Sequence, residues 1–176
     1  MKDLKSYIRT VPDFPKEGIQ FRDVTTLLGN PASFRHAVDA IVAAFKNDKI
    51  QKVAAIEARG FVLGGAIAHR LGAGFIPIRK EGKLPEQTIA ESYSLEYGEA
   101  TLEMHLDALA PGDRILVVDD LIATGGTVDA ALALIDRQGG DVVGCAFVVD
   151  LPDLGGSTKL KTRCERVVSL CSFEDD

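Results

Sequence analysis

The sequence predicts an α/β protein with a central, mainly parallel sheet flanked by helices. Short apolar runs rich in β-branched residues alternate with stretches of helical periodicity along most of the chain. Such alternation indicates parallel strands joined by helices that cover both faces of the sheet. The 176 residues, 46% hydrophobic and 26% charged, are enough for one ordinary domain, which we expect to span residues 1–176.

The N-terminal 30 residues are expected to stand apart from this sheet. A short helix is predicted within residues 1–10, and Pro12, Pro15 and Gly18 then interrupt regular structure. Residues 15–23 are predicted to be irregular although they contain Phe21. An aromatic residue in such a segment can cover a planar ligand, or it can simply pin the N-terminal arm to the core.

Strands and helices then follow in turn. Asn30 before Pro31 is typical of a helix start, and an apolar stripe continues to Phe45. Further helices are predicted at residues 61–71 and 127–138. The predicted strands are residues 52–56, 75–78, 115–118, 142–149 and 167–170.

Residues 88–106 break the rhythm of strand and helix. Apolar and polar side chains alternate there on both sides of Gly98, which predicts a β-hairpin. An insertion of roughly 20 residues in such a sheet is often a flap over an active site.

Three charged or glycine-containing stretches begin where an apolar strand is predicted to end: residues 57–60, 79–85 and 119–127. Ligands of parallel α/β sheets bind outside the carboxyl ends of the strands. The fold should therefore bring these stretches together. The cationic residues of 79–85 could alternatively form a solvated loop.

Residues 119–127 combine two functions in one turn. The backbone N–H groups of residues 123–127, at a helix N-terminus, can surround a phosphate. Asp119 and Asp120 cannot bind phosphate, but they suit vicinal hydroxyls, a metal or a developing positive charge. A ribose 5-phosphate needs both halves. The alternative for the acidic pair is helix capping.

Composition and the remaining motifs exclude several classes. The net charge of −6 offers no basic face for nucleic acid. No signal peptide or membrane span is visible, and three cysteines without CxxC spacing are typical of a reducing cytoplasm, so we expect a cytoplasmic protein without membrane contact. The sequence contains no GxGxxG, Walker A, HExxH, GxSxG or Cys/His metal motif.

Residues 117–127 resemble the phosphoribosyl pyrophosphate (PRPP) signature of type I phosphoribosyltransferases. Within that superfamily the chain is similar to the adenine phosphoribosyltransferases. The matching stretches are residues 12–15, 18–23, 57–61, 79–85 and 93–98. The resemblance implies the type I phosphoribosyltransferase fold, with an N-terminal hood over about residues 1–30 and a β-hairpin flap over about residues 88–106. From about Leu151 onward the match is less clear.

The implied reaction converts adenine and PRPP to AMP and pyrophosphate with Mg²⁺, which PRPP carries and for which no direct protein ligand is assigned. Asp119 and Asp120 would accept the ribose hydroxyls and stabilise positive charge at C1. A homodimer is also implied. The residues expected to bind PRPP are Ala58, Arg59, Arg79, Lys80, Lys83, Asp119, Asp120, Ala123, Thr124, Gly125, Gly126 and Thr127.

The base would be bound by the hood. Phe21 would stack on adenine, the main chain of Gln20 and Arg22 would read its edge, and Arg59 would lie close to the base or the leaving group. Glu96 resembles the family's general acid/base, placed to manage a purine ring proton. From spacing alone, Glu96 could equally be a solvated hairpin residue.

Two other functions remain open. A transferase for hypoxanthine, guanine or xanthine would need a cation near the purine 6-oxo group, which Phe21 lacks and Arg22 could supply. A PRPP-sensing regulator of the same fold would bind nucleic acid. The pI of about 5.1 and the lack of a helix-turn-helix extension oppose the second of these.

Overall fold

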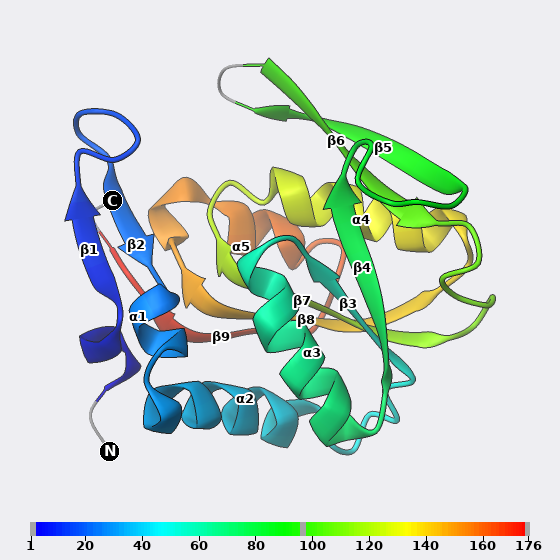
Figure 1. The fold of residues 1–176 in the computed structure, drawn as a ribbon, viewed down its shortest axis with the longest axis horizontal. Coiled ribbons are helices and arrows are strands. Elements are labelled where there is room, and N and C mark those ends of the chain that lie inside the picture. Colours follow the sequence, from blue (N-terminus) through cyan, green and yellow to red (C-terminus); the bar gives the residue numbers. More distant parts are fainter. Residues whose placement is uncertain (1–2, 96–97, 175–176) are drawn as a thin grey trace.

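The computed structural model describes residues 3–95 and 98–174. Its main sheet has seven strands in the order β5-β6-β4-β3-β7-β8-β9, and β4, β3, β7, β8 and β9 are parallel (Figure 1). The strands are β3 (Lys52–Ile56), β4 (Gly74–Lys80), β5 (Thr88–Leu95), β6 (Gly98–His105), β7 (Arg114–Ile122), β8 (Asp141–Asp150) and β9 (Val167–Ser172). The predicted mainly parallel α/β architecture is confirmed.

Helices cover both faces of this sheet. They are α1 (Thr25–Leu28), α2 (Pro31–Phe45), α3 (Arg59–Leu71), α4 (Gly126–Arg137) and α5 (Gly156–Leu160), with 3₁₀ turns η1 (Leu4–Tyr7) and η2 (Pro152–Leu154). The predicted start of α2 is confirmed, because the Asn30 side chain accepts hydrogen bonds from the N–H groups of Ala32 and Ser33 at 3.0 and 3.1 Å.

The apolar strands contribute side chains to two buried clusters, because successive side chains of a strand point to opposite faces of the sheet. Val53 and Ala55 of β3 belong to one buried cluster, which includes side chains of α2 and α3. Ala54 and Ile56 belong to the other cluster, which includes side chains of α4. Burial on both faces explains why these strands are uninterrupted apolar runs in the sequence.

The order of the strands creates a crevice between β3 and β7. The chain leaves β3 through α3 and returns as β4 on one side, whereas it leaves β7 through α4 and returns as β8 on the other. The two crossovers thus diverge from neighbouring strands, which pair in parallel from Lys52 with Ile115 to Ala55 with Val118. Such a switch point at the carboxyl ends is where open α/β sheets bind ligands.

Two antiparallel ribbons stand beside this crevice (Figure 1). β5 and β6 form the predicted hairpin. At the N-terminus, β1 (Arg9–Pro12) pairs with β2 (Gln20–Asp23), so the expectation that residues 15–23 are wholly irregular was wrong for the last four. The breakers Pro12, Pro15 and Gly18 lie at the end of β1 and in the connection between the two strands, where they do not prevent pairing.

Phe173, the residue that follows β9, attaches the N-terminal segment to the rest of the molecule. The ring of Phe173 lies under the guanidinium of Arg22, with 4.3 Å between the guanidinium carbon and the ring centroid, and Lys5 approaches the same ring at 5.2 Å. The backbone of Phe173 is fixed in turn, because its N–H donates to the carbonyl of Asp150 at 3.0 Å. The Arg22 side chain is therefore engaged with the C-terminal segment.

Candidate active site

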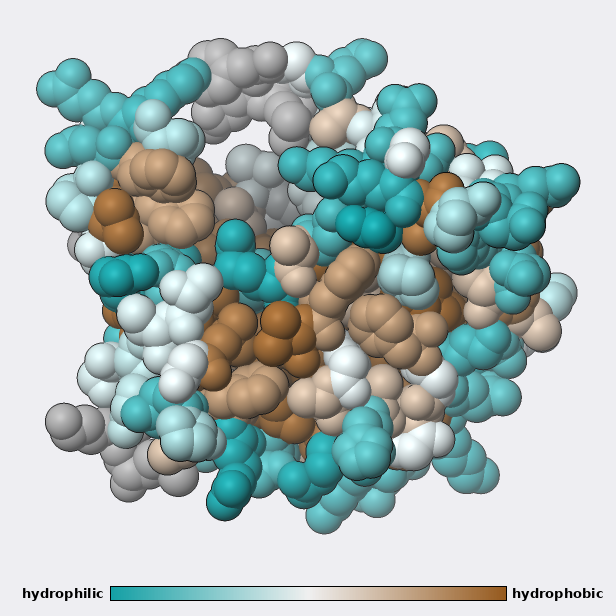
Figure 2. Space-filling view, in the orientation of Figure 1, coloured by the Kyte–Doolittle hydropathy of each residue, from teal (hydrophilic) through white to brown (hydrophobic). Residues whose placement is uncertain are grey.

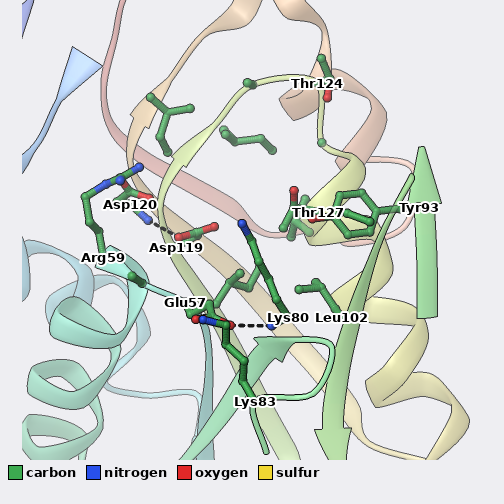
Figure 3. Close-up of a pocket in the computed structure, with 18 residues that line it drawn as sticks. Glu57, Arg59, Lys80, Lys83, Tyr93, Leu102, Asp119, Asp120, Thr124 and Thr127 are labelled. Carbon is green, nitrogen blue, oxygen red and sulfur yellow. Dashed lines mark hydrogen bonds and ion pairs between the residues drawn. The ribbon is translucent and has the colours of Figure 1, made fainter. Parts of the chain in front are cut away.

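A cavity of about 540 Å³ lies at the carboxyl ends of β3, β4 and β7 (Figure 3). It collects ten of the predicted PRPP-binding residues from three separate stretches of the chain. These are Ala58, Arg59, Lys80, Lys83, Asp119, Asp120, Ala123, Thr124, Gly125 and Thr127. The fold thus brings the strand-end stretches together, as the sequence predicted.

The acidic pair lies within β7 rather than after it, because the strand continues to Ile122. Asp120 is 5% exposed, and its Oδ2 accepts a hydrogen bond from Nε of Arg59 at 2.5 Å. Oδ1 of Asp119 accepts the N–H of Asp120 at 2.8 Å. The N-cap position of α4 is Gly125, which excludes the alternative that the acidic pair caps this helix.

Burial and the adjacent charge of Asp120 raise the pKa of Asp119 well above its ordinary value. The pKa of Arg59 is raised by the charge of Asp120, although burial opposes this. A carboxyl group with a perturbed pKa beside a paired cation, in a cleft, is typical of a functional site.

The start of α3 approaches β7 closely enough to require a glycine. A Cβ atom built on Gly60 would lie 2.7 Å from Oδ1 of Asp119 and 3.3 Å from the carbonyl oxygen of Val118. Only a residue without a side chain therefore lets residues 58–60 pack beside the acidic pair. The peptide bond between Glu57 and Ala58, at the start of this turn, is cis.

Glu57 organises the cationic wall of the cavity, although the sequence assigned it no role. Its Oε1 accepts the backbone N–H of Lys80 at 2.5 Å, and its Oε2 pairs with Arg79 at 3.3 Å. Although burial opposes the change, these two partners lower the pKa of Glu57. The carboxylate therefore fixes the backbone from which the Lys80 side chain enters the cavity (Figure 3).

Arg79 does not line this cavity, in contrast to the prediction that groups it with Lys80 and Lys83. Adjacent residues of β4 project to opposite faces. The guanidinium of Arg79 donates to the carbonyl of Lys83 at 3.1 Å and lies 5.9 Å from the ring centroid of Phe61 on α3. Gly126, the first residue of α4, is also absent from the lining and borders a neighbouring pocket instead.

The predicted base-binding residues Gln20, Phe21 and Arg22 lie on β2, outside the cavity lining. Arg59 connects them to the cavity, because its guanidinium carbon is 5.8 Å from the ring centroid of Phe21. Phe14 packs edge-on against the same ring at 5.1 Å. Glu96, the predicted acid/base, lies outside the described residues.

The sequence did not single out several apolar side chains that complete the cavity: Ile56, Tyr93, Ala100, Leu102, Leu121, Ile122 and Val128. The signal for Tyr93 was present, since the alternation of the hairpin gives β5 one inward face. Figure 3 shows its ring beside Thr127. The β5–β6 hairpin thus contributes an apolar wall next to the glycine-containing loop.

No group of three or more His, Cys, Asp or Glu side chains in residues 3–95 and 98–174 is placed to share a metal ion. Magnesium commonly keeps several waters and binds through one or two carboxylates and the phosphates of a substrate. The carboxylates of Asp119 and Asp120 at the cavity fit this mode of binding. In the same described residues, no helix is both long and apolar enough to cross a membrane.

Comparison with known proteins defines the class. The phosphoribosyl transferase domain family matches residues 23–174. The chain therefore belongs to the phosphoribosyltransferases. It is 60% identical to the adenine phosphoribosyltransferase of Dinoroseobacter shibae over 99% of this chain and 98% of the relative. Within the family, the chain accordingly belongs to the adenine phosphoribosyltransferases.

Solved structures agree with this assignment. The adenine phosphoribosyltransferase of Rhodothermus marinus superimposes with a TM-score of 0.91 at 54% identity, covering 97% of this chain and 96% of the other. The enzyme of Saccharomyces cerevisiae, solved with an imino-altritol bisphosphate and adenine, gives 0.88 at 37% identity over 95% and 96% of the two chains.

Proposed function

We propose that this protein transfers the phosphoribosyl group of PRPP to adenine, giving AMP and pyrophosphate in purine salvage. The observation that carries the proposal is the composition of the cavity. An acidic pair, a glycine-containing loop at a helix N-terminus and two lysines meet there at the carboxyl ends of neighbouring strands. These groups match the hydroxyls, the 5-phosphate and the pyrophosphate of PRPP.

The loop of residues 123–127, which we call the phosphate loop, would bind the 5-phosphate. Its backbone N–H groups precede and begin α4, so the helix dipole adds to their attraction for an anion. The hydroxyls of Thr124 and Thr127 would complete the set. Gly126 would contribute only its backbone N–H.

Asp119 and Asp120 would accept hydrogen bonds from the ribose hydroxyls. As the bond from C1 to pyrophosphate lengthens, positive charge develops on the ribose, and two preorganised carboxylates nearby stabilise it. Bound Mg²⁺ would neutralise part of the charge on the leaving pyrophosphate. We assign the ion to PRPP, and the carboxylates of Asp119 and Asp120 would be available to bind it.

The leaving group would be received by the opposite wall. Lys80 and Lys83 line the cavity there, and the backbone of residues 58–60 borders it. Arg59 would fix Asp120 and contact the base through its position near Phe21. Arg79 would act on the same wall through its contact with the carbonyl of Lys83.

Adenine would stack on Phe21, with the main chain of Gln20 and Arg22 at its edge. This use of the main chain is compatible with the fold, because the Arg22 guanidinium is engaged with Phe173. We assign the general acid/base role at the purine ring to Glu96. The yeast relative, which was solved with adenine, supports this choice of base.

We also propose that the protein acts as a homodimer in the cytoplasm, with residues 1–176 forming one catalytic domain. Figure 2 shows apolar side chains gathered over α3. Val62 and Phe75 are 49% and 40% exposed, and the Phe75 ring packs edge-on against Phe61 at 5.5 Å. Exposed apolar patches of this kind mark protein interfaces. Sedimentation of the wild type and of Val62→Asp tests the assembly; a monomeric wild type would refute it.

A base-competition assay tests the reaction. Pyrophosphate release is measured with PRPP, Mg²⁺ and adenine, hypoxanthine or guanine in turn. Adenine should give a kcat/KM far above that of either oxopurine. A preference for an oxopurine would assign the enzyme to another base, and lack of turnover combined with nucleic-acid binding in a filter assay would favour the regulatory alternative.

A further inference from the structure

Residues beyond Leu151 gave no functional signal in the sequence, yet the start of α5 lies directly against the phosphate loop. The N–H of Gly156 donates to the carbonyl of Ala123 at 3.0 Å. The Cα of Gly156 would be only 3.2 Å from a Cβ built on Gly125, whose φ of +83° already favours glycine. The backbones of Gly125 and Gly156, which are distant in the sequence, are therefore in direct contact.

The contact leaves no space for a side chain at position 156. A Cβ built on Gly156 would overlap the carbonyl oxygen of Ala123, and it would lie 2.7 Å from the nitrogen of Gly125 and 2.8 Å from the carbonyl carbon of Thr124. All three atoms belong to the backbone, so no side-chain rotation can relieve the overlap. The phosphate loop or α5 would have to move.

α5 itself is anchored on two sides, so the loop is the part that we expect to yield. Leu160 is 3% exposed and belongs to the same buried cluster as the side chains of α4. Asp129 of α4 pairs with Lys159 at 3.1 Å and also with Arg163, and Arg163 pairs with Asp136 at 2.7 Å. The short helix is therefore fixed to α4, whose N-terminus the loop precedes.

We propose that Gly156 is a positioning residue, which sets the shape of the phosphate loop by supporting its backbone from behind. The inference rests on the proposed function, in which the N–H groups of this loop bind the 5-phosphate. Gly156 would not touch the substrate. It would keep the N–H of Gly125 and its neighbours directed toward the phosphate by excluding every other arrangement of residues 123–125.

Gly156→Ala tests the proposal by steady-state kinetics. The KM for PRPP should rise at least about tenfold, corresponding to the loss of roughly one hydrogen bond to a charged group. The KM for adenine should stay within about twofold of the wild-type value. A merely structural role would lower the melting temperature and the active fraction without separating the two KM values.

Gly74→Ala is the matched control. Gly74 begins β4 at the end of the strand opposite the cavity, and a Cβ built on it meets its nearest atom, Cγ of Lys52, at an ordinary contact distance of 3.6 Å. Its kinetic constants should equal those of the wild type. A folded Gly156→Ala enzyme with a wild-type KM for PRPP would overturn the assignment, whereas an inactive wild type would count against the proposed function itself.

If Gly156→Ala does not fold, hydrogen exchange on the wild-type protein decides. PRPP with Mg²⁺, added without adenine, should slow exchange in peptides covering residues 123–127 and in those covering residues 155–161, because the two backbones move as one unit. Protection of the phosphate loop without protection of α5 would refute the proposal.

Discussion

Arg59 and Asp120 form an ion pair that joins two otherwise separate parts of the site. Nε of Arg59 lies 2.5 Å from Oδ2 of Asp120, and the same guanidinium lies 5.8 Å from the ring centroid of Phe21. One side chain thus connects the β7 carboxylates with the hood. The side chain of Asp120 is 8% exposed and that of Arg59 is 41% exposed, so the ion pair lies at the boundary of the core.

Substitution of the two aspartates should change stability in opposite directions, although both substitutions should lower kcat. Asp120→Asn should weaken the ion pair and lower the free energy of unfolding by about 1 kcal/mol, since Arg59 is partly solvated. Each single variant should lower kcat by roughly 10²-fold as one charge near C1 is lost. The double variant should be folded by circular dichroism and inactive; near wild-type kcat would contradict the assignment of both residues.

The raised pKa of Asp119 predicts a dependence of stability on pH. Between its unfolded pKa of about 4 and its folded pKa, the folded state binds more protons, so stability falls as pH rises. Asp119→Asn should therefore melt at a higher temperature than wild type at neutral pH, and the difference should shrink toward pH 4. Thermal melts across pH measure this; a less stable Asn variant at pH 7 would contradict it.

For Asp23 we expect the opposite dependence of stability on pH. A hydrogen bond from Thr25 and the guanidinium of Arg9 lower the pKa of Asp23 to about 2. The stability that it contributes is complete above the unfolded pKa of about 4 and is lost as pH falls toward 2. Asp23→Asn should be less stable than wild type at pH 7 and equal to it near pH 2, again by thermal melts. Equal melting temperatures at both pH values would argue against this pairing.

Glu57 should act through the geometry of Lys80. Glu57→Ala removes the acceptor of the Lys80 N–H and should raise the KM for PRPP roughly tenfold, because the lysine is no longer directed at the leaving group. Glu57→Gln keeps an acceptor oxygen and should recover most of that loss. Steady-state kinetics compare the two; equal damage in both would mean that the negative charge, and not the positioning, matters.

Glu96 carries the predicted proton transfer. Glu96→Gln should lower kcat by roughly 10²- to 10⁴-fold at the pH optimum, the usual contribution of a general acid/base. It should also remove one limb of the pH profile of kcat. An unchanged kcat with an altered KM would identify Glu96 as a contact of the flap without a role in proton transfer.

The sequence predicted the elements whose signals are local. Asn30 caps α2 as expected, and the apolar runs became the two-sided strands of the sheet. The sequence also predicted the position of the cavity, because the carboxyl ends of parallel strands lie at the same edge of the sheet. The four-residue strand β2 was missed, since the glycine and prolines before it outweighed its short apolar alternation.

Other parts of the site depend on contacts that leave no local pattern. The separation of Arg79 from Lys80 required the orientation of β4, which the charged run 79–83 does not reveal. The proximity of Gly156 to Gly125 joins backbones about 30 residues apart, so a single sequence contains no trace of it. The link from Arg59 to Phe21 likewise exists only once α3 and β2 are placed.

The cation–π contact between Arg22 and Phe173 has a consequence for biosynthesis. The ribosome delivers β1 and β2 first, whereas Phe173 emerges after every strand of the sheet has been made. The contact between the N-terminal ribbon and Phe173 can therefore form only after β9 has been synthesised. The packing around β2 is therefore completed only after the last strand of the sheet has been synthesised.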